Sequence, residues 1–296
     1  MAWKRGNRLR LVQQAGMDSR VAQVLEDIQH SLGLATVGSM YGALAAYPEF
    51  LATSWRAIKP SVHTVKFLDC AGRLRAGAFT RVHSYLGVPD LRGCVNPSTS
   101  LDDLGSVIDI FHQTDSILLI LCAFQLQALD GPAGTGAPSP APQSVPTPPS
   151  LKLDSPEQFV SPLVKRTLSD IRRTFQAPFD SVECVAFGRW PEFLVAYWRS
   201  LRPAVTSPLF HHCQRGIRED AWQLARELPG PVEELTSTQL LETMPEEDVA
   251  SIVRIAEFFF DHLSALVLCV AFAKIAAEGG TRRLRESSPA SVSRVA

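Results

Sequence analysis

Apolar residues recur every three or four positions along much of the chain. Two clear examples are the sets Val21, Val24, Leu25, Ile28 and Leu32, and Phe50, Leu51, Ser54, Trp55 and Ile58. This spacing places the apolar side chains on one face of a helix. No segment alternates apolar and polar residues in the way a half-buried strand does. The sequence therefore predicts an all-α protein.

One block of sequence occurs twice at a constant separation. Residues 48–51 (PEFL), followed by Trp55 and Arg56, recur as residues 191–194, followed by Trp198 and Arg199. The same separation relates Leu25, Asp27, Ile28, Phe67 and Cys70 to Leu168, Asp170, Ile171, Phe210 and Cys213. Further on, a slightly larger separation relates Phe111, Leu119, Leu121 and Cys122 to Phe258, Leu266, Leu268 and Cys269. The sequence therefore predicts a pseudo-twofold duplication of one helical unit.

Composition divides the chain into five segments. Helical repeats are expected at residues 18–130 and 151–279, and a linker rich in Pro, Gly and Ala joins them at residues 131–150. A basic leader at residues 1–17 and a polar tail at residues 280–296 are expected to be disordered. Two copies of one unit leave a cleft between their facing surfaces, and a ligand site is expected there.

Charge and hydropathy limit the classes of partner. The net charge of −1 gives no field that would attract nucleic acid, so we expect no nucleic-acid partner. The apolar runs at residues 116–124 and 263–273 are shorter than the roughly 20 residues of a membrane span, so core helices and no membrane partner are expected. Six scattered cysteines favour a reducing compartment, hence the cytoplasm, whereas a cleaved basic leader would indicate a mitochondrial protein.

Glu183 is the clearest chemical difference between the copies, because its counterpart in the first copy is Met40. Asp180 or Ser181 is a suitable N-cap, which would put Glu183 in the first turn of a helix. A surface capping carboxylate is one interpretation, and the local sequence favours it. The other is a general base, because apolar neighbours would raise the pKa of this carboxyl.

Other polar residues are open to two interpretations. His112 with Asp115, and Asp261 with His262, precede the long apolar run of each copy. They would lie either at the mouth of an interior cleft or on a solvated helix face, and the second is the more common situation. Adjacent His211 and His212 diverge on a helix, so we predict no metal site. Motifs for nucleotides, serine hydrolases and metalloproteases are missing, and no cofactor is expected.

Residues 42–51 with Trp55, echoed by residues 186–191 with Trp198, resemble the group I 2-haloacid dehalogenases, which act on both D and L enantiomers. The likeness covers about residues 18–130 and 151–278. It implies an all-helical pseudo-dimer whose active site lies between the repeats. It also implies direct displacement of halide at C2 by a water that an aspartate deprotonates, and a homodimer in solution.

The resemblance places the site residues. The family's catalytic aspartate corresponds to Glu183, one methylene longer, and substrate-binding positions correspond to Thr36, Asp115, Val182 and Phe259. The family has tryptophan, asparagine, serine and tyrosine at those four positions. A second carboxylate at Asp115 is expected to repel an anionic acid.

Two functions therefore remain in competition. The first is a dehalogenase-like hydrolase of small 2-halocarboxylic acids, with Glu183 as general base and a small carboxylic acid as ligand. The alternative is a catalytically inactive dehalogenase-like scaffold that binds a ligand or another protein. A helical thiol peroxidase is a third, weaker interpretation, since the chain has no C-x-x-C pair.

Overall fold

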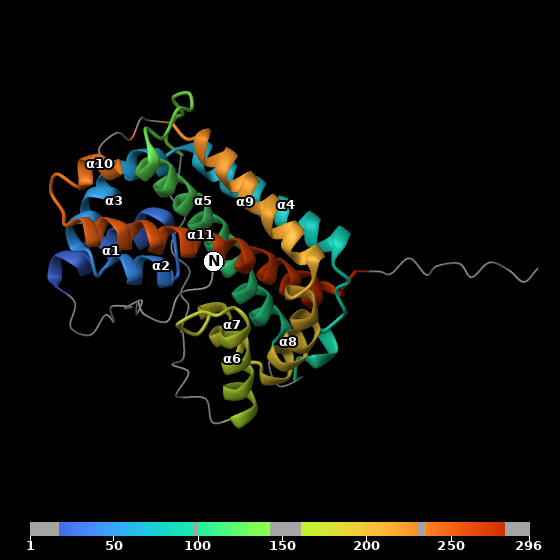
Figure 1. The fold of residues 1–296 in the computed structure, drawn as a ribbon. Coiled ribbons are helices and arrows are strands. Elements are labelled where there is room, and N and C mark those ends of the chain that lie inside the picture. The colour runs from blue at the N-terminus through green and yellow to red at the C-terminus, as the bar shows by residue number, and fades with distance from the viewer. Residues whose placement is uncertain (1–17, 97–99, 143–160, 230–231, 233–234, 282–296) are drawn as a thin grey trace, which may run out of the picture.

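The fold is all-helical, which confirms the predicted class. The computed structural model describes residues 18–96, 100–142, 161–229, 232 and 235–281, and this part of the chain has no β-strand (Figure 1). The first copy contains α1 (Ser19–Leu32), α2 (Gly38–Leu44), α3 (Pro48–Val62), α4 (Val65–Tyr85), η1 (Arg92–Cys94) and α5 (Leu101–Asp130). The second contains α6 (Pro162–Thr174), α7 (Val182–Phe187), α8 (Pro191–Val205), α9 (Pro208–Arg226), α10 (Ser237–Leu240) and α11 (Glu246–Glu278). The basic leader and nearly all of the polar tail lie outside the described residues.

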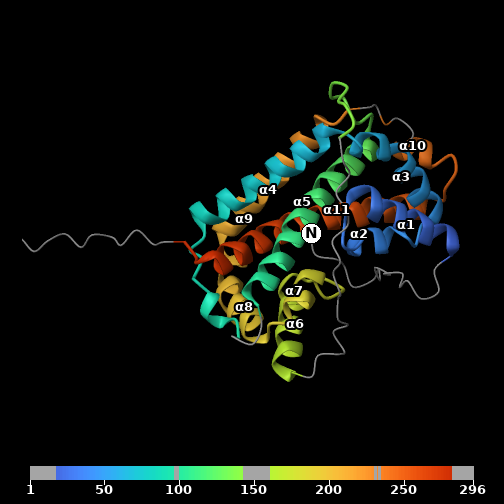
Figure 2. The same ribbon diagram turned by 180° about the vertical axis from the view of Figure 1, so that it is seen from behind.

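The helices correspond in pairs at the separation found in the sequence. Both α3 and α8 begin at the proline of the repeated block, and α4 and α9 begin at the equivalent positions Val65 and Pro208. Figures 1 and 2 show α4 and α9 side by side along one edge, with α5 and α11 crossing in the middle. Helices α1 to α3 lie at one end, and α6 to α8 lie at the other.

The two long helices, α5 and α11, form the centre of the core. Each is long and apolar enough to cross a membrane by length and composition alone, contrary to the expectation from the shorter apolar runs. However, 83% of the apolar window of each helix is buried inside the fold. Because each helix is apolar on nearly all sides, each has to be covered by other helices, and they pack chiefly against one another.

The repeated block has the same structural role in both copies. Trp55 donates a hydrogen bond from Nε1 to Asp27 of α1 at 2.6 Å, and Trp198 donates the equivalent bond to Asp170 of α6 at 2.8 Å. A cation one turn after each Trp also binds the same Asp: Lys59 at 2.8 Å, and Arg202 at 3.2 Å. Residues kept in both copies therefore tie the first helix of each copy to the third.

The first part of the linker packs against the folded body. Gly136 N–H donates to the Leu228 carbonyl at 3.0 Å, and Val65 N–H donates to the Pro140 carbonyl at 2.9 Å. A side chain at Gly136 would place its Cβ 1.9 Å from the carbonyl oxygen of Glu227, so only glycine allows this approach. Residues 131–142 are thus held in place, while the rest of the linker lies outside the described part of the chain.

We predict that Trp198→Phe lowers the free energy of unfolding by about 1–2 kcal/mol, because Asp170 loses a charge-assisted hydrogen bond while the aromatic packing largely remains. Urea unfolding followed by circular dichroism measures the change. In an Asp170→Asn background the same substitution should cost clearly less. Equal costs in the two backgrounds would show that packing, and not the hydrogen bond, accounts for the loss.

Candidate functional site

A small cavity lies where α2 and α7 meet the two central helices. It is lined by both members of five equivalent pairs from the two copies, namely Thr36 and Phe179, Gly38 and Ser181, Ser39 and Val182, Met40 and Glu183, and Asp115 and His262. A cavity with both members of each pair in its wall lies on the pseudo-twofold axis. Its volume is about 20 Å³, which is room for about one water molecule.

All five candidate site residues line this cavity: Thr36, Asp115, Val182, Glu183 and Phe259. Two come from the first copy and three from the second. The carboxylates of Asp115 on α5 and Glu183 on α7 are both buried, at 1% and 7% exposure. The chain thus brings together residues that are distant in sequence, although their individual roles stay predictions.

Ser181 is the N-cap of α7, as its sequence position predicted. Its Oγ accepts a hydrogen bond from the backbone N–H of Cys184 at 3.4 Å and donates one to Oε2 of Glu183. The expectation of a surface capping carboxylate at Glu183 was wrong, because α5 covers this end of α7. Ser181 also offers a hydroxyl beside the carboxylate, although the resemblance places the family's serine at Val182.

Asp115 and Glu183 form a hydrogen-bonded carboxyl pair. Burial, together with the nearby charge of Glu183, raises the pKa of Asp115 well above its usual value. Burial also raises the pKa of Glu183, but hydrogen bonds from Ser181, from its own backbone N–H and from Asp115 oppose that rise. Asp115 is therefore the carboxyl of the pair that holds a proton more strongly, and Glu183 is the one that ionises more readily.

The raised pKa of Asp115 argues against the expectation that it adds a second negative charge. Two buried carboxylates in contact disfavour each other's ionisation, so the pair resists carrying two negative charges. A protonated carboxyl also offers one donor and one acceptor, as an asparagine side chain does. Its Oδ2 is buried and has no hydrogen-bond partner among the described residues, so it is available to a ligand.

His262 is a site residue whose position the sequence did not settle. It lies about one turn after Phe258 and Phe259 on α11, and the rings of Phe175 and Phe179 also surround it. Burial lowers its pKa to about 4, so the imidazole is neutral at pH 7. The solvated-face expectation was wrong for His262, Asp115 and His112, all of which are buried. The signal for His262 was its equivalence to Asp115 in the repeat.

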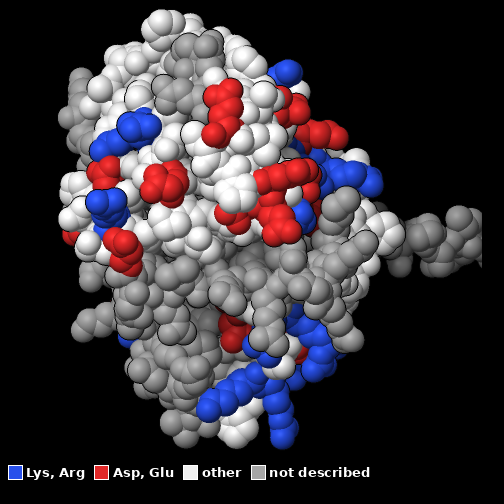
Figure 3. All heavy atoms as spheres, turned by 60° about the vertical axis from the view of Figure 1, so that its left-hand side comes forward, with Lys and Arg blue, Asp and Glu red and all other residues white. Residues whose placement is uncertain are grey.

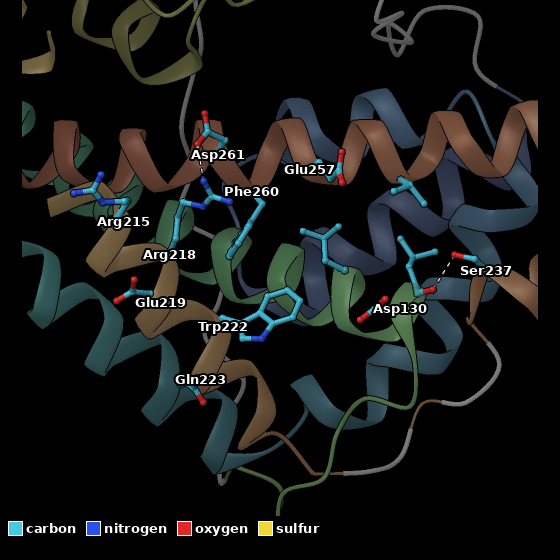
Figure 4. Close-up of a pocket in the computed structure, with 13 residues that line it drawn as sticks. Asp130, Arg215, Arg218, Glu219, Trp222, Gln223, Ser237, Glu257, Phe260 and Asp261 are labelled. Carbon is cyan, nitrogen blue, oxygen red and sulfur yellow. Dashed lines mark hydrogen bonds and ion pairs between the residues drawn. The ribbon is translucent and has the colours of Figure 1, made fainter. Parts of the chain in front are cut away.

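Two larger cavities lie away from the carboxyl pair. One of them, of about 830 Å³, lies between α5, α9 and α11 and contains none of the candidate residues (Figure 4). Its charges are mixed: Arg218 pairs with Asp261 at 3.1 Å and lies over the ring of Phe260. Figure 3 likewise shows both basic and acidic side chains on one face of the molecule. In the part of the chain that the structure describes, no group of three His, Cys, Asp or Glu is placed to hold a metal ion.

The small cavity can support one kind of chemistry. It combines two buried carboxyl groups joined by a hydrogen bond and room for about one water, with aromatic walls that limit hydration. A carboxylate with a raised pKa is a suitable base for a water molecule at near-neutral pH. This geometry is compatible with base-assisted attack by water.

Comparison with known proteins finds relatives of similar length. The chain is 25% identical over 272 residues to an (R)-2-haloacid dehalogenase of Pseudomonas putida, covering 88% of this chain and 90% of the relative. It is 23% identical over 243 residues to an (R)-2-haloacid dehalogenase of Rhizobium sp. (strain NHG3), covering 75% and 89%.

Solved structures share the fold. A D-2-haloacid dehalogenase in complex with L-LA has a TM-score of 0.84 and 22% identity, covering 92% of this chain and 97% of that one. A mutant D-2-haloacid dehalogenase with D-2-CPA also gives 0.84, at 21% identity and with the same coverage. At this level of identity the likeness establishes the all-helical fold.

A family model matches the part of the chain that supplies most of the cavity's lining residues. The model described as "Halocarboxylic acid dehydrogenase DehI" matches residues 36–183, half of the chain, and its two ends fall on the cavity residues Thr36 and Glu183. The chain therefore belongs to the halocarboxylic acid dehydrogenase DehI family.

Proposed function

We propose that the protein hydrolyses small 2-halocarboxylic acids, with a water molecule attacking C2 and Glu183 as its general base. One observation carries this proposal: the Glu183 carboxyl is buried and hydrogen-bonded to Asp115, whose pKa burial raises well above its usual value, beside room for about one water. Membership of the family and the names of both relatives support 2-haloacids as the substrate class.

The proposed reaction balances without a covalent intermediate. Glu183 takes a proton from water, the water oxygen bonds to C2, and the carbon–halogen bond breaks. The halide leaves with the bonding electrons, and the product is a 2-hydroxy acid. Asp115 stays protonated and hydrogen-bonded to Glu183, which holds the base in one orientation. The proton on Glu183 returns to solvent after the product leaves.

Ser181 offers an explanation of how glutamate replaces the family's aspartate. A side chain one methylene longer has an additional torsion and would place its carboxylate less reproducibly. In this structure Ser181 binds Oε2 from two residues away, and Asp115 binds the same carboxylate from α5. Both contacts restrict the longer side chain.

The substrate must widen the cavity, because a haloacid is several times larger than the water that fits there. Thr36 and Val182 are partly exposed, whereas Asp115 and Phe259 are buried. Thr36 lies just before α2, and Val182 is the first residue of α7. Both helices are short, so few helical turns hold these two residues in place. We therefore place the substrate entrance between Thr36 and Val182.

We predict that Glu183→Gln abolishes halide release from 2-chloropropionate, a loss of at least about a thousandfold, because an amide cannot accept the proton of water. Halide is measured by ion chromatography, separately for the R and S enantiomers. The R form is expected to react on the strength of the relatives' names, and the S form tests the wider range that the resemblance implied. Thermal unfolding should show Glu183→Gln as stable as the parent, since a buried charge is removed.

Three other outcomes separate the alternatives. Retention of activity by Glu183→Gln would exclude this residue as base. Halide release from only one enantiomer would limit the substrate range to that enantiomer. Folded parent protein that releases halide from neither enantiomer would contradict the proposed reaction and favour the inactive ligand-binding scaffold.

We predict a bell-shaped pH dependence of kcat/KM. Activity should rise as Glu183 ionises, and its raised pKa puts this limb above the usual range for glutamate. Activity should fall at higher pH as Asp115 ionises, because the cavity then carries two negative charges. Asp115→Asn keeps a donor to Glu183 and has no proton to lose, so it should remove the alkaline limb. An unchanged alkaline limb in this variant would assign it to another group.

A further inference from the structure

We propose that His262 binds the departing halide, by donating a hydrogen bond from Nε2, and that the cavity behind it is the halide's exit. This rests on the proposed function. His262 lines the same cavity as Glu183 and Asp115. Its Nε2 is buried, and no group in the described part of the chain binds it. The side chain is 6% exposed, so the polar atom faces the interior and not bulk water.

Displacement at C2 needs a donor on the leaving-group side. As the carbon–halogen bond breaks, negative charge grows on the halogen, and a fixed donor in a dry site stabilises that charge. Glu183 and Asp115 supply the base side and already share a proton, so neither offers an additional donor to the halogen on the opposite side of C2. Among the described residues, no Lys or Arg lines the cavity. A neutral imidazole N–H provides the donor. A positively charged side chain would instead bind the released halide too tightly.

The surroundings of His262 suit a halide better than a carboxylate. Phe258 stacks on the imidazole at 5.4 Å between ring centroids, and Phe179 meets it edge to face at 5.5 Å. Large halides are polarisable and need few hydrogen bonds, so an aromatic pocket with a single donor is adequate. Thr36, Ser39 and Thr114 also line the cavity, and we assign their hydroxyls as donors for the substrate's carboxylate.

His262 also forms a wall of a second cavity, of about 380 Å³. This cavity is lined by Phe175, Phe210 and Phe258 on its apolar side, and it reaches exposed residues at Thr206 and His211. His262 therefore lies between the cavity of the carboxyl pair and one that reaches solvent, and we take this second cavity as the halide's exit. The substrate entrance between Thr36 and Val182 lies on other helices.

The first copy has a much smaller equivalent of this second cavity. Its counterpart is lined by Ser31, Leu32, Val62, His63, Phe67 and Leu68, and each of them is equivalent in the repeat to a residue of the larger cavity. Here the volume is only about 10 Å³, and Pro142 of the linker forms part of the wall. The linker is fixed by Val65 N–H, whose counterpart Pro208 has no N–H to donate. In the described part of the chain, the wide form of this cavity is therefore the one in the second copy.

The test compares His262→Phe with His112→Phe. His112 is the matched control: it is also buried on a central helix, its pKa is also lowered to about 4, and its Nε2 also has no partner among the described residues, but it does not line the cavity. We expect His262→Phe to lower kcat for 2-chloropropionate at least about tenfold. The loss for 2-bromopropionate should be several-fold smaller, because bromide is the better leaving group and needs less help.

A second measurement does not depend on activity. Crystals of the parent protein in sodium bromide should show an anomalous bromine peak at His262, and crystals of His262→Phe should not. A parent protein without turnover would contradict the proposed function, but bromide at His262 would still support this halide site. Equal chloride-to-bromide ratios in the two variants, or bromide bound equally well by His262→Phe, would overturn the inference.

Discussion

The mutual burial of α5 and α11 is the constraint on which the rest of the molecule depends. Each helix is apolar around most of its circumference and is stable in water only when others cover it. Packing the equivalent helices of two copies across one axis meets this need with a single interface. Any polar residue on the facing surfaces is then trapped at the axis, and Asp115 and His262 are the equivalent pair trapped there.

The site arises from differences between copies that fold alike. The interactions common to both, such as each Trp bound to an Asp of the first helix, hold the copies in equivalent shapes. Because the two copies have equivalent shapes, equivalent residues line opposite sides of the same cavity on the axis. Met40 and Glu183 show the result, since one supplies an apolar wall and the other a carboxylate to a single cavity. Duplication thus fixes the geometry, and divergence at a few positions supplies the polar groups.

The sequence predicted the helices and the duplication because both produce a regular spacing of residues along the chain. It also predicted that Glu183 and Asp115 share a site, through the resemblance. It could not give the burial of Glu183, because the local signals at Ser181 and Glu183 are those of an ordinary helix start and the covering helix is far away in sequence. The sequence also did not predict that the first part of the linker packs against the folded body. Gly136 is typical of a flexible segment, yet here glycine is required for the close approach to Glu227.

The proton shared by Asp115 and Glu183 changes how the site should treat an anionic substrate. A carboxylate that enters the cavity meets one negative charge, held by three hydrogen-bond donors on Glu183, and not two. Its approach raises the pKa of Glu183 further, because like charges disfavour ionisation. In the proposed reaction, a higher pKa makes Glu183 a stronger base when a water and C2 are both in place. The repulsion that would weaken binding in the ground state therefore favours proton transfer, and this compensation works only while Asp115 keeps its proton.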